Sequence, residues 1–149
     1  MKYSIIIPVF NRPDEVDELL ESLCLQTVKD FEVLIVEDGS QRDCKAVVDR
    51  YADRLDVKYF MKPNSGPGQS RNYGAERANG EWLIILDSDV VLPKGYLEAV
   101  DNSLTSHLYS CLRWSRRCPP LVHPCSEGHQ LFHDLLLHHW RYPRRQGKT

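Results

Sequence analysis

Four short apolar runs lie within the first ninety residues of the chain. They occupy residues 3–9, 31–36, 57–60 and 82–86, and each is nearly continuous rather than alternating with polar positions. Continuous hydrophobicity over about four to eight residues is typical of strands that are buried on both faces of a parallel sheet. The pattern therefore predicts four strands of such a sheet.

Between these runs, apolar residues recur three and four positions apart, as they do along one face of an amphipathic helix. Alternating strands and helices predict an α/β fold of the Rossmann-like kind, with a mostly parallel sheet, right-handed crossovers and helices on both faces. The helical positions are Val16, Leu19, Leu20 and Leu23 after Pro13; Cys44, Val47, Val48 and Tyr51; residues 69–78; and Leu97, Val100 and Leu104.

A polar segment follows each predicted strand. These segments are residues 8–12, 37–40, 64–72 and 87–89. In an open α/β sheet, ligands bind beyond the carboxyl ends of the strands, and parallel strands bring those ends to one edge. We therefore expect the four segments to converge there and to form the binding site.

Asp87 and Asp89 stand one residue apart, directly after the last apolar run. Residues i and i+2 of an extended chain project to the same side, so both carboxylates can reach one cation. Oxygen ligands suit Mg²⁺ or Mn²⁺, which protein carboxylates commonly share with substrate phosphates. The alternative is a solvated turn, because Asp readily occupies turns.

The glycine-containing segment 64–71 is a second candidate for binding a phosphate. Backbone N–H groups at a helix start bind anions, and Arg71 adds a fork of donors. The segment lacks both the Gly-Lys-Ser/Thr of a Walker loop and the third glycine of a dinucleotide fingerprint. The alternative is a long turn with Arg71 on a solvated face. Asp38 also has two interpretations: it contacts the base or ribose of a ligand, or it caps the next helix.

Charge divides the chain in a way that hydropathy alone does not. A length of 149 residues suits one domain. Residues 1–106 carry 12 Lys and Arg against 19 Asp and Glu, whereas residues 107–149 carry seven against two, with all six His and three of the five Cys. We therefore predict an α/β unit over residues 1–104 and an atypical basic tail, rich in Cys and His, over residues 105–149.

Several classes of protein are excluded or disfavoured. No apolar run approaches the roughly 18 residues of a membrane span. The first apolar run is strand-sized and has no small-residue cleavage site, so we expect no signal peptide. Five cysteines without close pairing favour reduced thiols. We expect a cytoplasmic address, with a peripheral position at the inner membrane face as a variant, and no nucleic-acid partner.

In order along the chain, the strand ends read IIIPVFNR (5–12), VLIVEDGS (33–40), NSGPGQSRN (64–72) and LIILDSD (83–89). As an ordered set they resemble the N-terminal half of the family 2 glycosyltransferases, which have the GT-A fold. The resemblance covers residues 1 to about 104. It implies binding of a nucleotide-diphosphate sugar, linked to UDP or GDP, and inverting transfer of the sugar to an acceptor hydroxyl.

The resemblance also implies roles for single residues. Pro8, Phe10 and Asn11 match positions that line the nucleotide pocket, with Phe10 where the family often has Tyr, and Glu15 is expected to contact this pocket. Asp38 matches the acidic residue that reads the base.

The remaining matches concern the diphosphate and the cation. Arg71 matches a residue facing the donor, Asp87 the first carboxylate of the family's Asp-x-Asp motif, near the ribose, and Asp89 the metal-binding one. A divalent ion there, Mn²⁺ or Mg²⁺, neutralises the leaving diphosphate. Inverting transfer also needs a base, and the segment downstream of the motif offers only Glu127 and Asp134, neither in a recognisable family context.

The tail has three interpretations. Its Cys and His residues suggest a zinc module, although Cys111, Cys118 and Cys125 lack the usual close pair. Residues 129–140 carry an amphipathic helical pattern. The third interpretation is a frameshift between about Ser103 and Cys111, because degenerate back-translation in the next frame permits a string similar to the family's acceptor-side segment.

On the frameshift interpretation the chain is a truncated GT-A fold that lacks its acceptor half, with uncovered edges that favour self-association. The acceptor implied by the resemblance is a saccharide or a lipid-linked molecule. The alternatives to a glycosyltransferase are a module that binds a nucleotide sugar without turnover and a Cys/His metal-binding protein.

Overall fold

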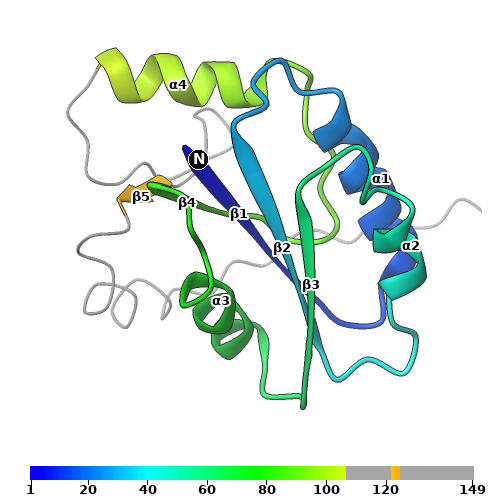
Figure 1. Cartoon of the computed structure of the whole chain (residues 1–149). Coiled ribbons are helices and arrows are strands. Elements are labelled where there is room, and N and C mark those ends of the chain that lie inside the picture. Colours follow the sequence, from blue (N-terminus) through cyan, green and yellow to red (C-terminus); the bar gives the residue numbers. More distant parts are fainter. Residues whose placement is uncertain (107–121, 125–149) are drawn as a thin grey trace, which may run out of the picture.

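The computed structural model describes residues 1–106 and 122–124, which form a sheet with helices on both faces (Figure 1). The elements in chain order are β1 (Tyr3–Val9), α1 (Pro13–Cys24), β2 (Phe31–Asp38), α2 (Lys45–Asp49), β3 (Val57–Lys62), α3 (Pro67–Ala75), β4 (Trp82–Ile85), α4 (Tyr96–Ser106) and β5 (Val122–Pro124).

The sheet has the strand order β3-β2-β1-β4-β5. β1, β2, β3 and β4 are parallel, whereas β5 pairs antiparallel with β4. The predicted α/β fold with a mostly parallel sheet is therefore confirmed. Because β1 and β2 lie inside the sheet, they are apolar on both faces, which explains their continuous hydrophobic runs.

The largest part of the core lies on one face of the sheet. Alternate residues of β1 and β2, from Tyr3 and Phe31 onward, pack against the apolar stripe of α1 and against Leu97 and Val100 of α4. α2 adds Val48 to the same cluster. The four predicted positions of α1, Val16, Leu19, Leu20 and Leu23, are all buried.

α3 covers the opposite face, as Figure 1 shows. A Cβ on Gly74 would lie only 2.5 Å from Cγ2 of Ile6, so glycine at this position lets α3 pack closely against β1. With α1, α2 and α4 on one face and α3 on the other, the prediction of helices on both faces is confirmed.

Some predicted boundaries were wrong by a few residues. α2 ends at Asp49, so Tyr51 lies beyond it, although its side chain is buried in the core. α3 begins at Pro67 rather than residue 69 and ends at Ala75 rather than residue 78. Proline is favoured in the first turn, where its missing N–H has no helical partner to lose. The candidate zinc ligands and the helix predicted over 129–140 lie outside the described residues, except His123 in β5.

Within residues 1–106 and 122–124, none of the helices combines the length and the apolar character needed to span a bilayer.

Candidate functional site

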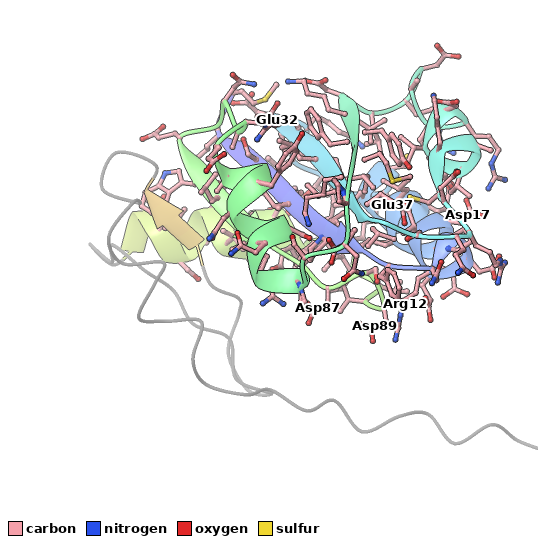
Figure 2. The ribbon with its side chains drawn as sticks, turned by 90° about the horizontal axis from the view of Figure 1, so that it is seen from below. Arg12, Asp17, Glu32, Glu37, Asp87 and Asp89 are labelled. Carbon is pink, nitrogen blue, oxygen red and sulfur yellow. The ribbon has the colours of Figure 1, made fainter. Side chains whose placement is uncertain are left out.

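The four polar strand ends converge at the carboxyl edge of the sheet, as expected. Contacts between them join the loops: Asn11 after β1 bonds to Ser40 after β2, and Arg12 contacts Asp89 after β4. Figure 2 shows Arg12, Asp87 and Asp89 together at this edge, with Glu32 at the far end of the molecule. The carboxyl edge therefore gathers charged side chains from distant parts of the sequence.

Asp38 ends β2 and is only 4% exposed. Its Oδ1 accepts hydrogen bonds from Lys62 Nζ and from the Ser65 N–H (2.9 Å), and its Oδ2 accepts one from the Gly66 N–H (2.8 Å). Burial alone would raise the pKa of Asp38, but these hydrogen bonds outweigh it, and the pKa lies below its ordinary value. Asp38 is thus an ionised carboxylate that fixes the loop leading into α3.

Arg71 projects from α3 to Asp87, with 3.0 Å between Nη2 and Oδ1. The Asp87 side chain is 55% exposed, whereas that of Arg71 is 24% exposed. Arg71 Nε is buried and has no hydrogen-bond partner within the described part of the chain. The predicted donor-facing arginine and the first carboxylate of the Asp-x-Asp motif are therefore direct neighbours.

Asp89 faces the other side of the motif, toward the loop between β1 and α1. Its Oδ2 lies 3.5 Å from Nη1 of Arg12, which also contacts Glu15 Oε1 at 3.3 Å. These three side chains are exposed by 37%, 47% and 43%. Each carboxylate of the motif thus has one arginine partner and remains open to solvent.

The residues predicted to line the nucleotide pocket lie at the end of β1. Pro8 is part of β1, next to Val36 of β2, and Phe10 is an exposed aromatic residue. Asn11 has φ of +54°, in the left-handed region that asparagine tolerates better than most residues. Its Oδ1 accepts hydrogen bonds from the N–H groups of Gln41 (2.8 Å) and Arg42 (3.0 Å). Asn11 therefore ties the first two strand ends together.

Beneath this loop lies Glu37, which is fully buried. One oxygen accepts a hydrogen bond from the Ser40 hydroxyl, and the other accepts bonds from the N–H (2.9 Å) and the thiol (2.8 Å) of Cys44. Burial, and then the hydrogen bond to Glu37, raise the pKa of Cys44, so the thiol stays protonated and donates. Glu37 thus joins the end of β2 to the start of α2.

The donor set at Asp87 and Asp89 fits a hard divalent cation. Among the described residues, no group of three or more His, Cys, Asp or Glu side chains is placed to hold a metal ion. Mg²⁺ and Mn²⁺ are commonly held by one or two carboxylates, with substrate phosphates and water completing the coordination. The two aspartates supply oxygen donors of this kind. The expectation that both project to one side of an extended chain was wrong, because Ser88 and Asp89 lie in a turn and the two carboxylates contact different arginines.

The sequence analysis assigned no role to three residues at this edge: Arg12, which contacts Asp89; Lys62, which contacts Asp38; and Glu37, which is buried. For two of them the sequence held a clue. Glu37 is a charged residue at the end of an apolar run, and Lys62 pairs in register with Asp38 once β3 is extended by two residues. The base candidates Glu127 and Asp134 lie outside the described residues.

Comparison with protein families gives one consistent result. Residues 4–118 match the model of Glycosyl transferase family 2. An uncharacterized glycosyltransferase of Rickettsia felis is 40% identical over 97 residues, which are 65% of this chain but 16% of that protein. The poly(ribitol-phosphate) β-N-acetylglucosaminyltransferase TarS of Staphylococcus aureus is 34% identical over 111 residues, 72% of this chain and 19% of TarS.

The fold is also similar to those of solved glycosyltransferase structures. TarS 1–349 in complex with UDP-GlcNAc has a TM-score of 0.70 at 33% identity, over 74% of this chain and 33% of that one. A mannosyltransferase from Pyrobaculum calidifontis, in complex with GDP-Man and Mn²⁺, has a TM-score of 0.61 at 23% identity, over 69% of this chain and 31% of that one. The second likeness supports the fold alone. This chain thus spans only a small part of the length of the relatives it matches.

Proposed function

This chain belongs to glycosyl transferase family 2, and we propose that its carboxyl-edge site binds the nucleoside diphosphate of a nucleotide sugar. The observation that carries the proposal is the Asp-x-Asp motif, whose two open carboxylates face different arginines, Arg12 just before α1 and Arg71 in α3. A diphosphate and a divalent cation bring opposite charges in nearly equal amounts, so they can exchange with these ion pairs at little electrostatic cost.

The base binds, in this proposal, where Pro8, Phe10, Asn11 and Asp38 lie, and the ribose binds near Asp87. Phe10 offers an exposed ring against which a base can pack. A carboxylate oxygen accepts about two hydrogen bonds, and among the described residues Asp38 Oδ2 accepts one, from the Gly66 N–H. The second acceptor position of Oδ2 suits an N–H group of the base. The structure of TarS with UDP-GlcNAc favours a uridine donor over a guanosine one.

The diphosphate and its cation bind, in this proposal, at Arg71, Asp87 and Asp89. Glu15 and Arg12 lie beside Asp89. Mn²⁺ or Mg²⁺ on Asp89 and Asp87 would supply neutralisation of the charge that develops on the leaving diphosphate. A guanidinium carries five N–H donors; Arg71 directs Nη2 to Asp87 and its side chain is partly exposed, so it can also donate to a phosphate oxygen.

Transfer to an acceptor hydroxyl needs a base, and the described residues supply no candidate in the family position. We therefore propose that residues 1–104 are the donor-binding half and that acceptor binding, saccharide or lipid-linked, requires more of the family's length. The family match itself extends past this boundary to residue 118. The second candidate is a module that binds a nucleotide sugar without turnover, which would use the same carboxyl-edge residues.

Titration calorimetry of the full chain with UDP, with and without Mn²⁺, tests the proposal. We expect Mn²⁺-dependent binding that weakens at least about tenfold in Asp89→Asn, because removing a charged partner in such a site costs about 1.5–3 kcal/mol. The matched control is Asp49→Asn, an exposed carboxylate of α2 that pairs with Lys45.

Equal UDP binding by the wild-type chain with and without Mn²⁺, or by Asp89→Asn and wild type, would contradict the site. GDP in place of UDP tests the choice of base. Hydrolysis of a nucleotide-sugar donor, measured with the same chain, separates a catalyst from a binding module.

A further inference from the structure

The buried carboxylate of Glu37 has no role in the site described so far. Its side chain is fully buried, so it cannot contact a donor itself. Both oxygens are occupied by hydrogen bonds from Ser40 and Cys44, and the Tyr59 hydroxyl approaches Oε2 at 3.5 Å. A charged group buried in this way costs free energy unless its hydrogen bonds are satisfied.

Ser40 connects Glu37 to the loop between β1 and α1, which contains Phe10 and Asn11. The Ser40 hydroxyl donates to Glu37 Oε1, and the same Oγ accepts the Asn11 N–H at 2.8 Å. Asn11 follows Phe10 directly and has a positive φ, a conformation that the surrounding contacts must maintain. A continuous chain of hydrogen bonds therefore runs from the buried carboxylate through Ser40 to the backbone of the β1–α1 loop.

The direction of these bonds matters. Because the Ser40 proton is engaged by Glu37, the Ser40 oxygen lone pairs are available for the Asn11 N–H. A backbone N–H can only donate, so the contact with Asn11 leaves the Ser40 hydroxyl proton for Glu37 Oε1. The second oxygen of Glu37 anchors Cys44 before α2, which fixes the other side of the 39–44 loop.

We propose that Glu37 is a positioning residue of the nucleotide site, which holds Phe10 and Asn11 in place through Ser40. This inference rests on the proposed function. It predicts that disturbing Glu37 or Ser40 weakens nucleotide affinity, although Glu37 does not touch the nucleotide.

The test compares UDP affinity, measured by calorimetry in the presence of Mn²⁺, for variants of the full chain. Ser40→Ala removes the link between Glu37 and Asn11 and is expected to weaken UDP binding about fivefold, as for the loss of one hydrogen bond. In Glu37→Gln the amide oxygen is best placed toward the two donors of Cys44, which turns the NH₂ group toward Ser40. The Ser40 hydroxyl then loses its acceptor, and we expect a loss of about the same size.

Glu32→Gln is the matched control. Glu32 is the other fully buried glutamate of β2, but it lies at the opposite end of the strand, as Figure 2 shows. A general loss of stability affects both variants, so a merely structural role predicts similar UDP affinities for Glu32→Gln and Glu37→Gln. The positioning role predicts that Glu32→Gln stays within about twofold of wild type.

A double variant, Ser40→Ala with Glu37→Gln, completes the cycle. If Glu37 acts through Ser40, the double variant binds UDP about as well as Ser40→Ala alone. Losses that multiply, an effect of Ser40→Ala below twofold, or equal losses in the two glutamine variants would each overturn the positioning role. If the wild-type chain binds no UDP, the proposed function fails and this inference with it, whereas normal wild-type binding with unaffected variants refutes only the inference.

Discussion

Glu32, at the amino end of the parallel sheet, and the Asp-x-Asp pair, at the carboxyl end, are held in opposite ways. At the amino end, Glu32 is fully buried, and it accepts hydrogen bonds from Ser4, Lys58 and both the backbone and the side chain of Asn79. At the carboxyl end, Asp87 and Asp89 are 55% and 37% exposed, and each has one arginine partner.

The buried carboxylate stabilises the fold, whereas the exposed carboxylates can exchange their arginine partners for a ligand. Removing one partner of a buried carboxylate that accepts four hydrogen bonds lowers the free energy of unfolding substantially, because the remaining charge is left unsatisfied. Exposed ion pairs contribute little, so a ligand can replace them at little cost. We infer that Glu32 helps to fix the amino end of the sheet, and that Asp87 and Asp89, unlike buried Glu37 and Asp38 at the same end, can exchange their arginine partners for a charged ligand.

The largest effect is expected for Gly80→Ala at the amino end. A Cβ there would lie 2.5 Å from Ser4 N and 2.6 Å from Tyr3 C, and both are backbone atoms of β1 that cannot rotate away. The Gly80 N–H also donates to Ser4 Oγ at 2.7 Å. We expect the free energy of unfolding to fall by about 3 kcal/mol, measured by denaturant unfolding.

Gly95→Ala is the control for that measurement. None of the described atoms lies within 4 Å of a Cβ at Gly95, so alanine should change the free energy of unfolding by no more than about 0.5 kcal/mol. Equal losses in the two variants would show that close packing against β1 is not the cause.

The next effect is the pH dependence that comes from Glu32. Burial alone would raise the pKa of Glu32. The hydrogen bonds from Lys58, Ser4 and Asn79 lower it by more than burial raises it, so the pKa falls from an ordinary 4.5 to about 2. A depressed pKa stabilises the folded state above the unfolded pKa, and this stabilisation is lost as pH falls toward the folded pKa. Between pH 5 and pH 3 the loss amounts to about 2 kcal/mol.

Glu32→Gln isolates this contribution. The difference in unfolding free energy between wild type and Glu32→Gln should shrink by about 2 kcal/mol from pH 5 to pH 3. Glu21→Gln serves as the comparison, because Arg54 lowers the pKa of Glu21 at an exposed site where solvent screens the pair. A constant difference for Glu32→Gln across this range would refute the assignment.

Much of this picture could be predicted from sequence because it depends on local pattern. The four parallel strands, the helix stripe of α1 and the meeting of four loops at one edge follow from hydrophobic periodicity and from the topology of α/β sheets. The strand ends did not follow, since β2 continues to Asp38 and β3 to Lys62. There the hydrogen-bonded register with neighbouring strands, not hydrophobicity, sets the length.

The contacts within the site could not be predicted. Arg12 and Asp89 are 77 positions apart, and their meeting depends on how α1 and β4 pack against β1. The hydrogen bonds of Glu37 depend on where α2 begins. The roles assigned to Asp38, Arg71 and Asp89 as nucleotide, diphosphate and cation ligands remain predictions that the binding experiments test.

The smallest effect on stability is expected at the carboxyl end, in Arg12→Gln. Arg12 is 47% exposed and contacts Glu15 and Asp89 at 3.3 and 3.5 Å, so its loss should change the free energy of unfolding by less than about 0.5 kcal/mol. Lys58→Gln is the matched change at the amino end. Because it deprives buried Glu32 of its cation, we expect a loss of about 2 kcal/mol or more. Equal costs for the two variants in denaturant unfolding would remove the distinction between the fixed carboxylate and the exchangeable pair.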